Sequence, residues 1–228
     1  MNIVVSLLKK TSLYNKIYHP YRVRQEQIRF QKRIQNFEKG GLILLEKFAA
    51  IMDNKGIPYW LEFGSLLGAF RDNAFIKNDF DIDVGVQLSD ASQIYKLLID
   101  NGFELVREFH VRGENGLEQT YLYSGTTIDL FDFFPDGNAI KCNGFYNAQS
   151  KQIGKYFDIC VSEFIFEPFG LMKMAFLGLS IKVPSNIERH IIEVYGEGYR
   201  VYDPNFTDGY NKVKYPITEK VGCGYFIR

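Results

Sequence analysis

Cysteine is scarce in this 228-residue sequence, and its arrangement excludes two kinds of scaffold. Only Cys142, Cys160 and Cys223 are present, an odd number without CxxC spacing. Disulfide frameworks need paired cysteines, and structural zinc sites need closely spaced ligands. The sequence therefore predicts neither of them. Histidine is equally scarce, at three residues, and we expect each histidine to be structural or exposed.

Long apolar runs are also missing. The first eight residues, MNIVVSLL, are apolar but too short to span a bilayer, and no lysine or arginine precedes them as in a signal peptide. We therefore expect a cytoplasmic protein. The sequence has no internal repeat or low-complexity tract, and 46% of its residues are hydrophobic, which predicts one globular domain.

The net charge of zero hides an asymmetry along the chain. Residues 1–40 carry nine Lys or Arg against two Asp or Glu, a balance of +7, which leaves −7 on residues 41–228. We therefore divide the chain into a basic helical arm (1–40) and a main domain (41–228). The arm is expected either to contact an anionic partner, such as a membrane surface, or to be an ordinary solvated helix face. The acidic balance of the main domain argues against nucleic acid as a partner.

The apolar pattern predicts an α+β fold. Residues 21–54 repeat apolar positions at helical spacing, with a break expected at Gly40 and Gly41. Further helices are expected at residues 91–100 and 187–195. We predict strands rich in β-branched and aromatic residues at 57–62, 79–86, 103–110, 117–123, 126–134, 139–146 and 181–183, with a hairpin turn at 136–138.

The most informative segment, residues 64–83, reads GSLLGAFRDNAFIKNDFDID. Asp79, Asp81 and Asp83 are two residues apart, so on a strand their side chains leave one face, roughly 6 to 7 Å from one to the next. Carboxylates placed in this way repel one another unless cations or solvent screen them. Hard oxygen ligands suit Mg²⁺ or Mn²⁺, so the segment predicts a metal site.

Gly64 and Ser65 stand where a helix is expected to begin. Backbone N–H groups and the positive end of the helix dipole would favour an anion there, such as a nucleotide phosphate. Arg71 lies one helix further on and has two interpretations. It could bind phosphate through its forked donors, or it could form a surface salt bridge.

A metal site of this type needs another carboxylate from a neighbouring strand. The segment TTIDLFDFFPDG offers Asp129 and Asp132 among apolar residues. The two are three residues apart, so on a regular strand they point to opposite faces, and only one can reach the site. We favour Asp129, and Asp132 stays an alternative metal ligand.

Several motifs together resemble the LicD and fukutin family of the nucleotidyltransferase-fold superfamily. They are, in order, GSLLGAFR, FIKNDFDIDVGV, IDLFDFF, KVPSN and VYGEGY. The resemblance covers about residues 57–204 and is most specific in the block from Gly64 to Asp83. It implies a polymerase-beta-like mixed sheet flanked by helices.

The resemblance also implies roles for individual residues. Asp81 and Asp83 correspond to the central metal ligands, Asp79 to an additional acidic ligand, and Asp129 to the carboxylate of the next strand. Gly64 with Ser65 corresponds to the phosphate-binding turn. The sequence departs from the family pattern at Lys77-Asn78, where Pro-Trp is common, and at Phe80, which we expect to point away from the aspartates.

The activity implied by the resemblance is metal-dependent transfer of a phosphoalcohol, such as phosphocholine or ribitol phosphate. The donor would be a cytidine diphosphate (CDP) alcohol, and the acceptor a sugar hydroxyl of a cell-surface glycan or its lipid-linked precursor. One aspartate could accept the hydroxyl proton. Two alternatives stay open, namely transfer of a nucleotidyl group from a nucleoside triphosphate and a non-catalytic nucleotide-binding module.

Overall fold

A computed structural model describes residues 19–146, 153–201 and 217–227. The chain begins with one long helix, α2 (His19–Lys55), and then alternates strands and short helices before it becomes strand-rich. The elements that follow are β1 (Tyr59–Leu61), α3 (Phe63–Asp72), β2 (Asp81–Gln87), η2 (Leu88–Asp90), α4 (Ala91–Asp100), β3 (Glu104–Val111), β4 (Leu117–Tyr123), β5 (Thr126–Asp136), β6 (Ala139–Tyr146), β7 (Tyr156–Phe166), β8 (Leu171–Phe176), β9 (Leu179–Pro184), α5 (Ile187–Tyr195), η3 (Glu197–Arg200) and β10 (Ile217–Phe226).

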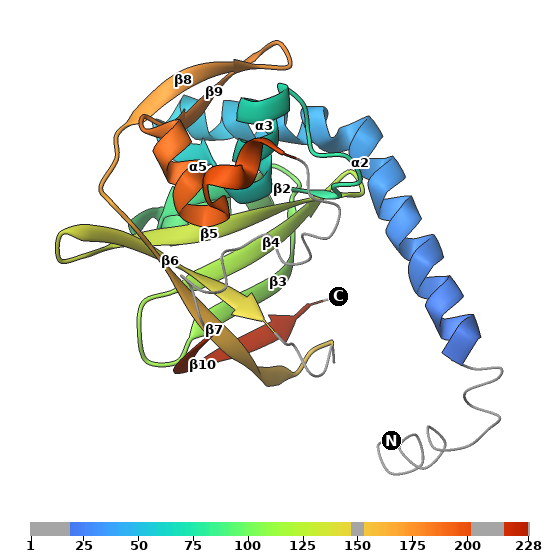
Figure 1. Ribbon diagram of the computed structural model, residues 1–228. Coiled ribbons are helices and arrows are strands. Elements are labelled where there is room, and N and C mark those ends of the chain that lie inside the picture. The colour runs from blue at the N-terminus through green and yellow to red at the C-terminus, as the bar shows by residue number, and fades with distance from the viewer. Residues whose placement is uncertain (1–18, 147–152, 202–216, 228) are drawn as a thin grey trace.

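The main sheet is mixed and has eight strands in the order β1-β2-β5-β4-β3-β10-β7-β6. Only β2 and β5 are parallel among its pairings in the described residues, and all the others are antiparallel. The end of β5 also pairs with β6, so strands β5, β4, β3, β10, β7 and β6 form a closed circuit. Figure 1 shows β6, β7 and β10 curving away beneath β3 and β4. The α+β class expected from the sequence is confirmed.

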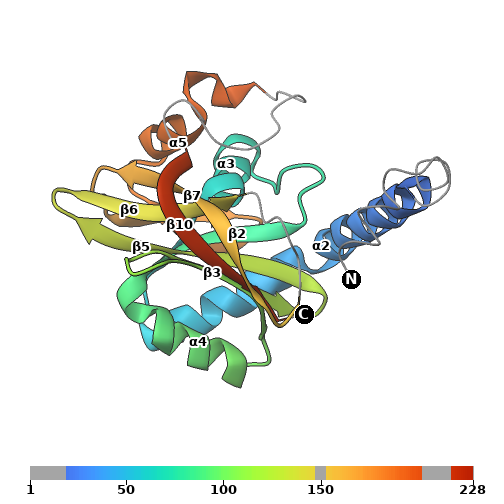
Figure 2. The ribbon, with the colours of Figure 1, turned by 90° about the horizontal axis from the view of Figure 1, so that it is seen from below.

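Helices cover the two faces of the β1-β2-β5 region of the sheet. Figure 2 shows α4 and the second half of α2 on one face, and α3 with α5 on the other. A large apolar core joins α2 and α4 to the central strands through residues such as Leu45, Ile94 and Ile128. A second, aromatic core lies beneath the start of α3 and contains Trp60, Phe63, Phe131, Phe133, Phe164 and Phe166.

The helix break expected at Gly40 and Gly41 does not occur, because α2 continues through both glycines. Gly40 lets the helix approach β5 closely, and Gly41 makes room for a ring of the same helix. A Cβ on Gly40 would stand 2.7 Å from Thr126 Oγ1 at the start of β5, and one on Gly41 would stand 3.0 Å from the ring of Phe37. The boundary drawn at residue 40 therefore falls inside a continuous helix.

The first half of α2 extends away from the body of the protein (Figure 1). The helix first enters the core at Ile34 and Phe37, which are 5% and 3% exposed. Between them, Asn36 Nδ2 donates a hydrogen bond to the Gly125 carbonyl at 3.2 Å. Residues 1–18 of the basic arm, including the apolar MNIVVSLL segment, lie outside the described residues.

Several strands follow the sequence expectation, and others were not expected. The hairpin turn is confirmed, because Asp136 pairs with Ala139 across Gly137, whose φ is 58°. The expected strand at residues 181–183 is the centre of β9. Strands β7, β8 and β10 were not predicted. Of these, β7 and β10 belong to the closed circuit of strands.

Candidate functional site

The three aspartates of the acidic segment occupy the entrance to β2. Asp81 and Asp83 lie on the strand and alternate with buried Ile82 and Val84, so their side chains leave the same face. Asp79 is not part of the strand, because β2 begins at Asp81. It follows a turn in which Asn78 has a φ of 69°, and its carboxylate accepts a hydrogen bond from Phe80 N at 3.2 Å.

The start of α3 lies directly against Asp83. The helix was expected to begin just after Gly64 and Ser65, but it begins at Phe63, so both residues belong to its first turn. Gly64 N donates to Asp83 Oδ2 at 3.1 Å, and Asp83 N donates to Ser65 Oγ at 2.9 Å. The expected phosphate turn and the acidic strand are therefore joined by two hydrogen bonds.

Gly64 also brings Asp79 into this group. A Cβ on Gly64 would stand 3.2 Å from Asp83 Oδ2 and 3.6 Å from Asp79 Oδ2. The side chain of residue 64 would therefore project between the two carboxylates. Glycine leaves that space between the two carboxylates open, and a cation is the ligand that such a space favours.

The neighbouring strand places Asp129 beside Asp83. The parallel ladder of β2 and β5 pairs Asp83 with Asp129, and adjacent strands lie about 4.8 Å apart. Asp129 is 7% exposed. Asp132 pairs instead with Val86, three residues along the ladder, so its side chain leaves the opposite face of β5. The structure thus brings Asp129, and not Asp132, next to the acidic segment.

Arg107 on β3 holds Asp129 in place. Its Nη2 atom donates to Asp129 Oδ2 at 2.9 Å and to Glu118 Oε1 at 3.1 Å. The cross-strand register explains this contact, because Asp129 is opposite Thr120 on β4, and Thr120 is opposite Arg107 on β3. Arg107 was not expected as a site residue. Its position in an expected strand, between Val106 and Glu108, gave no local signal of a role in the site.

Burial and mutual repulsion raise the pKa of the clustered carboxyl groups. Burial first, and also the charge of Asp129, raise the pKa of Asp79 to about 6. Burial and the other aspartates raise the pKa of Asp81 and of Asp83 well above the usual range. Negative charge is therefore costly at this position, and a cation would relieve that cost.

The acidic residues supply the type of donor atom that a hard divalent cation prefers, but their carboxylates are too far apart to surround one. Among residues 19–146, 153–201 and 217–227, no three Asp, Glu, His or Cys side chains converge closely enough to hold a metal ion. The donors are all carboxylate oxygens, which Mg²⁺ and Mn²⁺ prefer. Asp129 Oδ1 is buried and has no hydrogen-bond partner among those residues, so one ligand atom is available.

Asp132 lies in a different polar environment on the other face of β5. It is 1% exposed, and neither of its carboxylate oxygens has a hydrogen-bond partner in the described part of the chain. Burial, with added repulsion from Glu108 and Glu118, raises its pKa well above the usual range. Its charge also raises the pKa of Tyr121, for which burial is the larger cause. Burial therefore disfavours the ionised form of this side chain.

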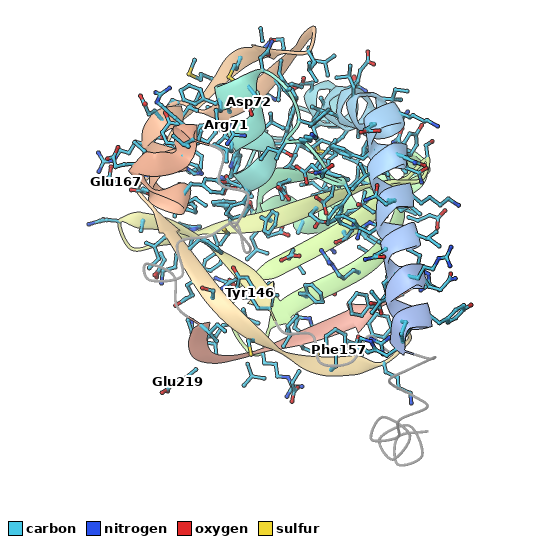
Figure 3. The ribbon with its side chains drawn as sticks, turned by 45° about the vertical axis from the view of Figure 1, so that its right-hand side comes forward. Arg71, Asp72, Tyr146, Phe157, Glu167 and Glu219 are labelled. Carbon is cyan, nitrogen blue, oxygen red and sulfur yellow. The ribbon has the colours of Figure 1, made fainter. Side chains whose placement is uncertain are left out.

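Arg71 turns towards the end of α3. Its Nε and Nη2 atoms donate to Asp72 Oδ2 at 2.9 and 2.7 Å, and Nη1 donates to the Tyr199 carbonyl at 3.4 Å. Figure 3 shows Arg71 and Asp72 together on α3. The arginine therefore forms the salt bridge that was the alternative interpretation, and a phosphate contact of Arg71 stays a prediction.

A second basic residue, Arg33, approaches the aspartates from α2. Its guanidinium carbon lies 3.9 Å from the centre of the Phe80 ring, and Nη2 lies 3.7 Å from Asp81 Oδ2. Phe30 of the same helix packs edge-on against Phe80, with 5.5 Å between ring centroids. Phe80 is therefore the point at which α2 contacts the acidic segment. No local pattern in the sequence indicates this contact, because the two segments are far apart along the chain.

A buried network supports the N-terminus of α3 from below. Glu62 caps the helix, accepting a hydrogen bond from Phe63 N at 3.3 Å and one from Trp60 Nε1 at 2.7 Å. His190 Nε2 lies 2.8 Å from Glu62 Oε1, and its ring stacks on Phe166. Glu62 therefore faces the aromatic core. His190 has the structural position that was expected.

The fold and the cluster define an α+β domain of the nucleotidyltransferase type. Residues 56–186 match the LicD/FKTN/FKRP nucleotidyltransferase domain, which is more than half of the chain. The protein therefore belongs to the LicD/FKTN/FKRP family. The matched segment includes α3, β2 and β5, which carry Gly64, Asp81, Asp83 and Asp129.

Two curated human proteins are similar in sequence. The chain is 27% identical to ribitol 5-phosphate transferase FKRP of Homo sapiens over 154 residues, which is 65% of this chain and 29% of that protein. It is 27% identical to ribitol-5-phosphate transferase FKTN of Homo sapiens over 167 residues, which is 72% of this chain and 34% of that protein. The chain thus spans about a third of the length of these relatives.

Two solved structures are similar in outline. The lincosamide antibiotic adenylyltransferase LnuA, bound to lincomycin, superposes with a TM-score of 0.43 and 14% identity, covering 73% of this chain and 89% of that one. The antibiotic-resistance factor ANT(2'')-Ia gives a TM-score of 0.45 and 14% identity, covering 77% of this chain and 81% of that one. Separately, no helix in the described residues is long and apolar enough to cross a membrane.

Proposed function

We propose that this protein transfers a phosphoalcohol, such as ribitol phosphate or phosphocholine, from a CDP-alcohol to a sugar hydroxyl of a glycan or its lipid-linked precursor. One observation carries the proposal. Asp81 and Asp83 leave one face of β2, Asp129 is the register partner of Asp83, and the first turn of α3 is hydrogen-bonded to the same carboxylate. Carboxylates and helix N–H groups together suit a diphosphate with its divalent cation.

Each group has a place in this reaction. Asp81, Asp83 and Asp129 would hold Mg²⁺ or Mn²⁺, with Asp79 as a further acidic ligand, and the cation would neutralise charge on the diphosphate. The Phe63 and Gly64 N–H groups already donate to Glu62 and Asp83, so the Ser65 hydroxyl at the start of α3 would donate to a phosphate oxygen. The acceptor oxygen forms a bond to the phosphorus that carries the alcohol, the bond to cytidine monophosphate (CMP) breaks, and an aspartate takes the hydroxyl proton.

The family similarity supports the same reaction class. The human relatives bear the name ribitol-5-phosphate transferase, although they are about three times longer than the matched segment. The alternative is transfer of a nucleotidyl group from a nucleoside triphosphate, which the description of the family as a nucleotidyltransferase domain favours. The two reactions release different products, CMP in the first and pyrophosphate in the second.

The test is product release by purified protein with Mg²⁺ or Mn²⁺, a panel of CDP-alcohols and sugar acceptors. We expect CMP release that Asp81→Ala abolishes and that the exposed control Asp100→Ala, at the far end of α4, preserves. Pyrophosphate release from a nucleoside triphosphate would establish the alternative. Equal behaviour of wild type and Asp81→Ala with every donor would leave only the non-catalytic binding module. The expected cytoplasmic location and the membrane contact of the basic arm stay predictions.

A further inference from the structure

Neither Arg71 nor Arg107 offers the acidic site a positively charged side chain that is free to bind a ligand. Arg71 is turned towards Asp72 and the Tyr199 carbonyl. Arg107 is half-buried, and two carboxylates, Asp129 and Glu118, accept hydrogen bonds from its Nη2 atom. The diphosphate of a CDP-alcohol carries two negative charges and the aspartates add their own, so one divalent cation leaves the site negative and a further positive group is expected beside the donor.

Arg33 lies close to the acidic site and has N–H donors that a phosphate could use. Its side chain is 50% exposed and lies 3.7 Å from Asp81 Oδ2, a distance too long for a hydrogen bond. In the described part of the chain the guanidinium makes no hydrogen bond, so all five of its N–H donors are available. Any phosphate held beside Asp81 lies within reach of these donors.

The surroundings of Arg33 fix its orientation. The guanidinium lies 3.9 Å above the Phe80 ring, and stacking on an aromatic face leaves the N–H edges of the planar group pointing outward. The helix itself is anchored one residue later, where Ile34 is buried, and again by the hydrogen bond of Asn36 to Gly125. Arg33 is thus presented to the site from a fixed part of α2.

We infer that Arg33 is a phosphate-binding residue of this site and contacts the diphosphate of the nucleotide donor. The inference rests on the proposed function and assigns part of the N-terminal helix to the donor site. Phe80, the aromatic residue within the acidic segment, would then serve as the surface on which Arg33 stacks. The uncharged sugar acceptor would have no need of this group.

The first test is binding of CDP with Mg²⁺ by titration calorimetry. We expect Arg33→Gln to weaken CDP binding by about tenfold to a hundredfold, because a charge-assisted hydrogen bond is lost. The matched control is Lys32→Gln, which removes a positive charge from the adjacent exposed position and should change affinity by less than about twofold. Equal affinities of the two variants would overturn the inference, as would failure of the wild type to bind CDP.

A second measurement separates phosphate binding from a structural role. Arg33 repels a cation bound at Asp81, so Arg33→Gln should bind Mn²⁺ alone as well as the wild type or more tightly. A structural role would weaken Mn²⁺ and CDP binding together, and that result contradicts the inference. Phe80→Leu should weaken CDP binding in the wild type and add little in Arg33→Gln, because the ring acts through the arginine.

Kinetics distinguish this inference from the proposed function. If the wild type releases CMP from a CDP-alcohol, Arg33→Gln should raise KM for that donor at least tenfold. An unchanged KM in an active enzyme would overturn the role of Arg33 and leave the proposed function intact. If the wild type releases no CMP, the proposed function fails, while the CDP titration still decides whether Arg33 binds phosphate.

Discussion

Asp83 and Asp129 are register partners on the two parallel strands of the main sheet, and each carboxylate accepts a hydrogen bond from a different element. Asp83 Oδ2 accepts a hydrogen bond from Gly64 N, and Asp129 Oδ2 accepts one from Arg107. The arrangement joins the start of a helix, two strands and a half-buried arginine at one point.

The acidic cluster should be less stable without a cation. In EDTA we expect Asp81→Asn to raise the melting temperature, because it removes one of several mutually repelling buried charges. Each kcal/mol gained corresponds to about 2–4 °C for a protein of this size. The same variant should lose most of the stabilisation that Mn²⁺ gives to the wild type. The measurement is thermal melting with and without Mn²⁺. A melting temperature of Asp81→Asn below that of the wild type in EDTA would contradict this account.

Stability without metal should fall as the pH rises. The pKa of Asp79 is raised from 3.8 to about 6, so between these values the folded state binds more protons than the unfolded state. The free energy of unfolding therefore decreases from about pH 4 to above pH 6. The measurement is a series of urea unfolding curves in EDTA, compared with Asp79→Asn, whose decrease should be smaller. An identical pH dependence in both proteins would show that Asp79 does not titrate in this range.

Arg107 should be important for both stability and metal binding. Arg107→Met leaves Asp129 and Glu118 without their partner, which should cost about 3–5 kcal/mol of unfolding free energy. The control is Arg112→Met, because the ion pair of Arg112 with Asp158 is exposed and should contribute less than about 1 kcal/mol.

A second substitution at this position tests whether Arg107 orients Asp129. In Arg107→Lys the charge remains, but the geometry of the fork is lost, so Mn²⁺ affinity should fall while the fold persists. Mn²⁺ binding followed by electron paramagnetic resonance gives the answer. Wild-type affinity in Arg107→Lys would limit this arginine to a role in stability.

Gly64→Ala should separate activity from folding. The added methyl would stand 3.2 Å from Asp83 Oδ2 and 3.6 Å from Asp79 Oδ2, where it narrows the space beside the helix N-terminus. Residue 64 lies inside a helix and has no positive φ, so alanine should fit the backbone. We expect a loss of CMP release of at least tenfold with a melting temperature within a few degrees of the wild type. Full activity would show that the donor does not approach Gly64.

Glu62 should be a strong determinant of stability. It is 0% exposed and accepts hydrogen bonds from Trp60 Nε1 and Phe63 N, while His190 lies against its other side. Glu62→Ala leaves these groups unpaired in the core, which should cost at least about 3 kcal/mol. Urea unfolding is the measurement, with Glu46→Ala on the exposed face of α2 as the control. A cost below about 1 kcal/mol would contradict the capping role.

The sequence predicted the parts of the site that depend on local periodicity. Alternation along a strand placed Asp81 and Asp83 on one face and separated Asp129 from Asp132. It did not predict Arg107 or Arg33, because their contacts depend on cross-strand register and on where α2 packs. The break expected at Gly40 and Gly41 was wrong, since close packing against β5 uses glycine without ending the helix.

The most direct test compares Asp129→Asn with Asp132→Asn in CMP release from CDP-alcohols. Both residues are buried carboxylates of β5, and the substitutions are equal in size and chemistry. We expect Asp129→Asn to lose at least a hundredfold in kcat/KM, because Asp129 is beside Asp83. Asp132→Asn should keep near-wild-type activity, since its side chain leaves the other face. Equal losses, or a larger loss for Asp132→Asn, would contradict a site built on the pairing of Asp83 with Asp129.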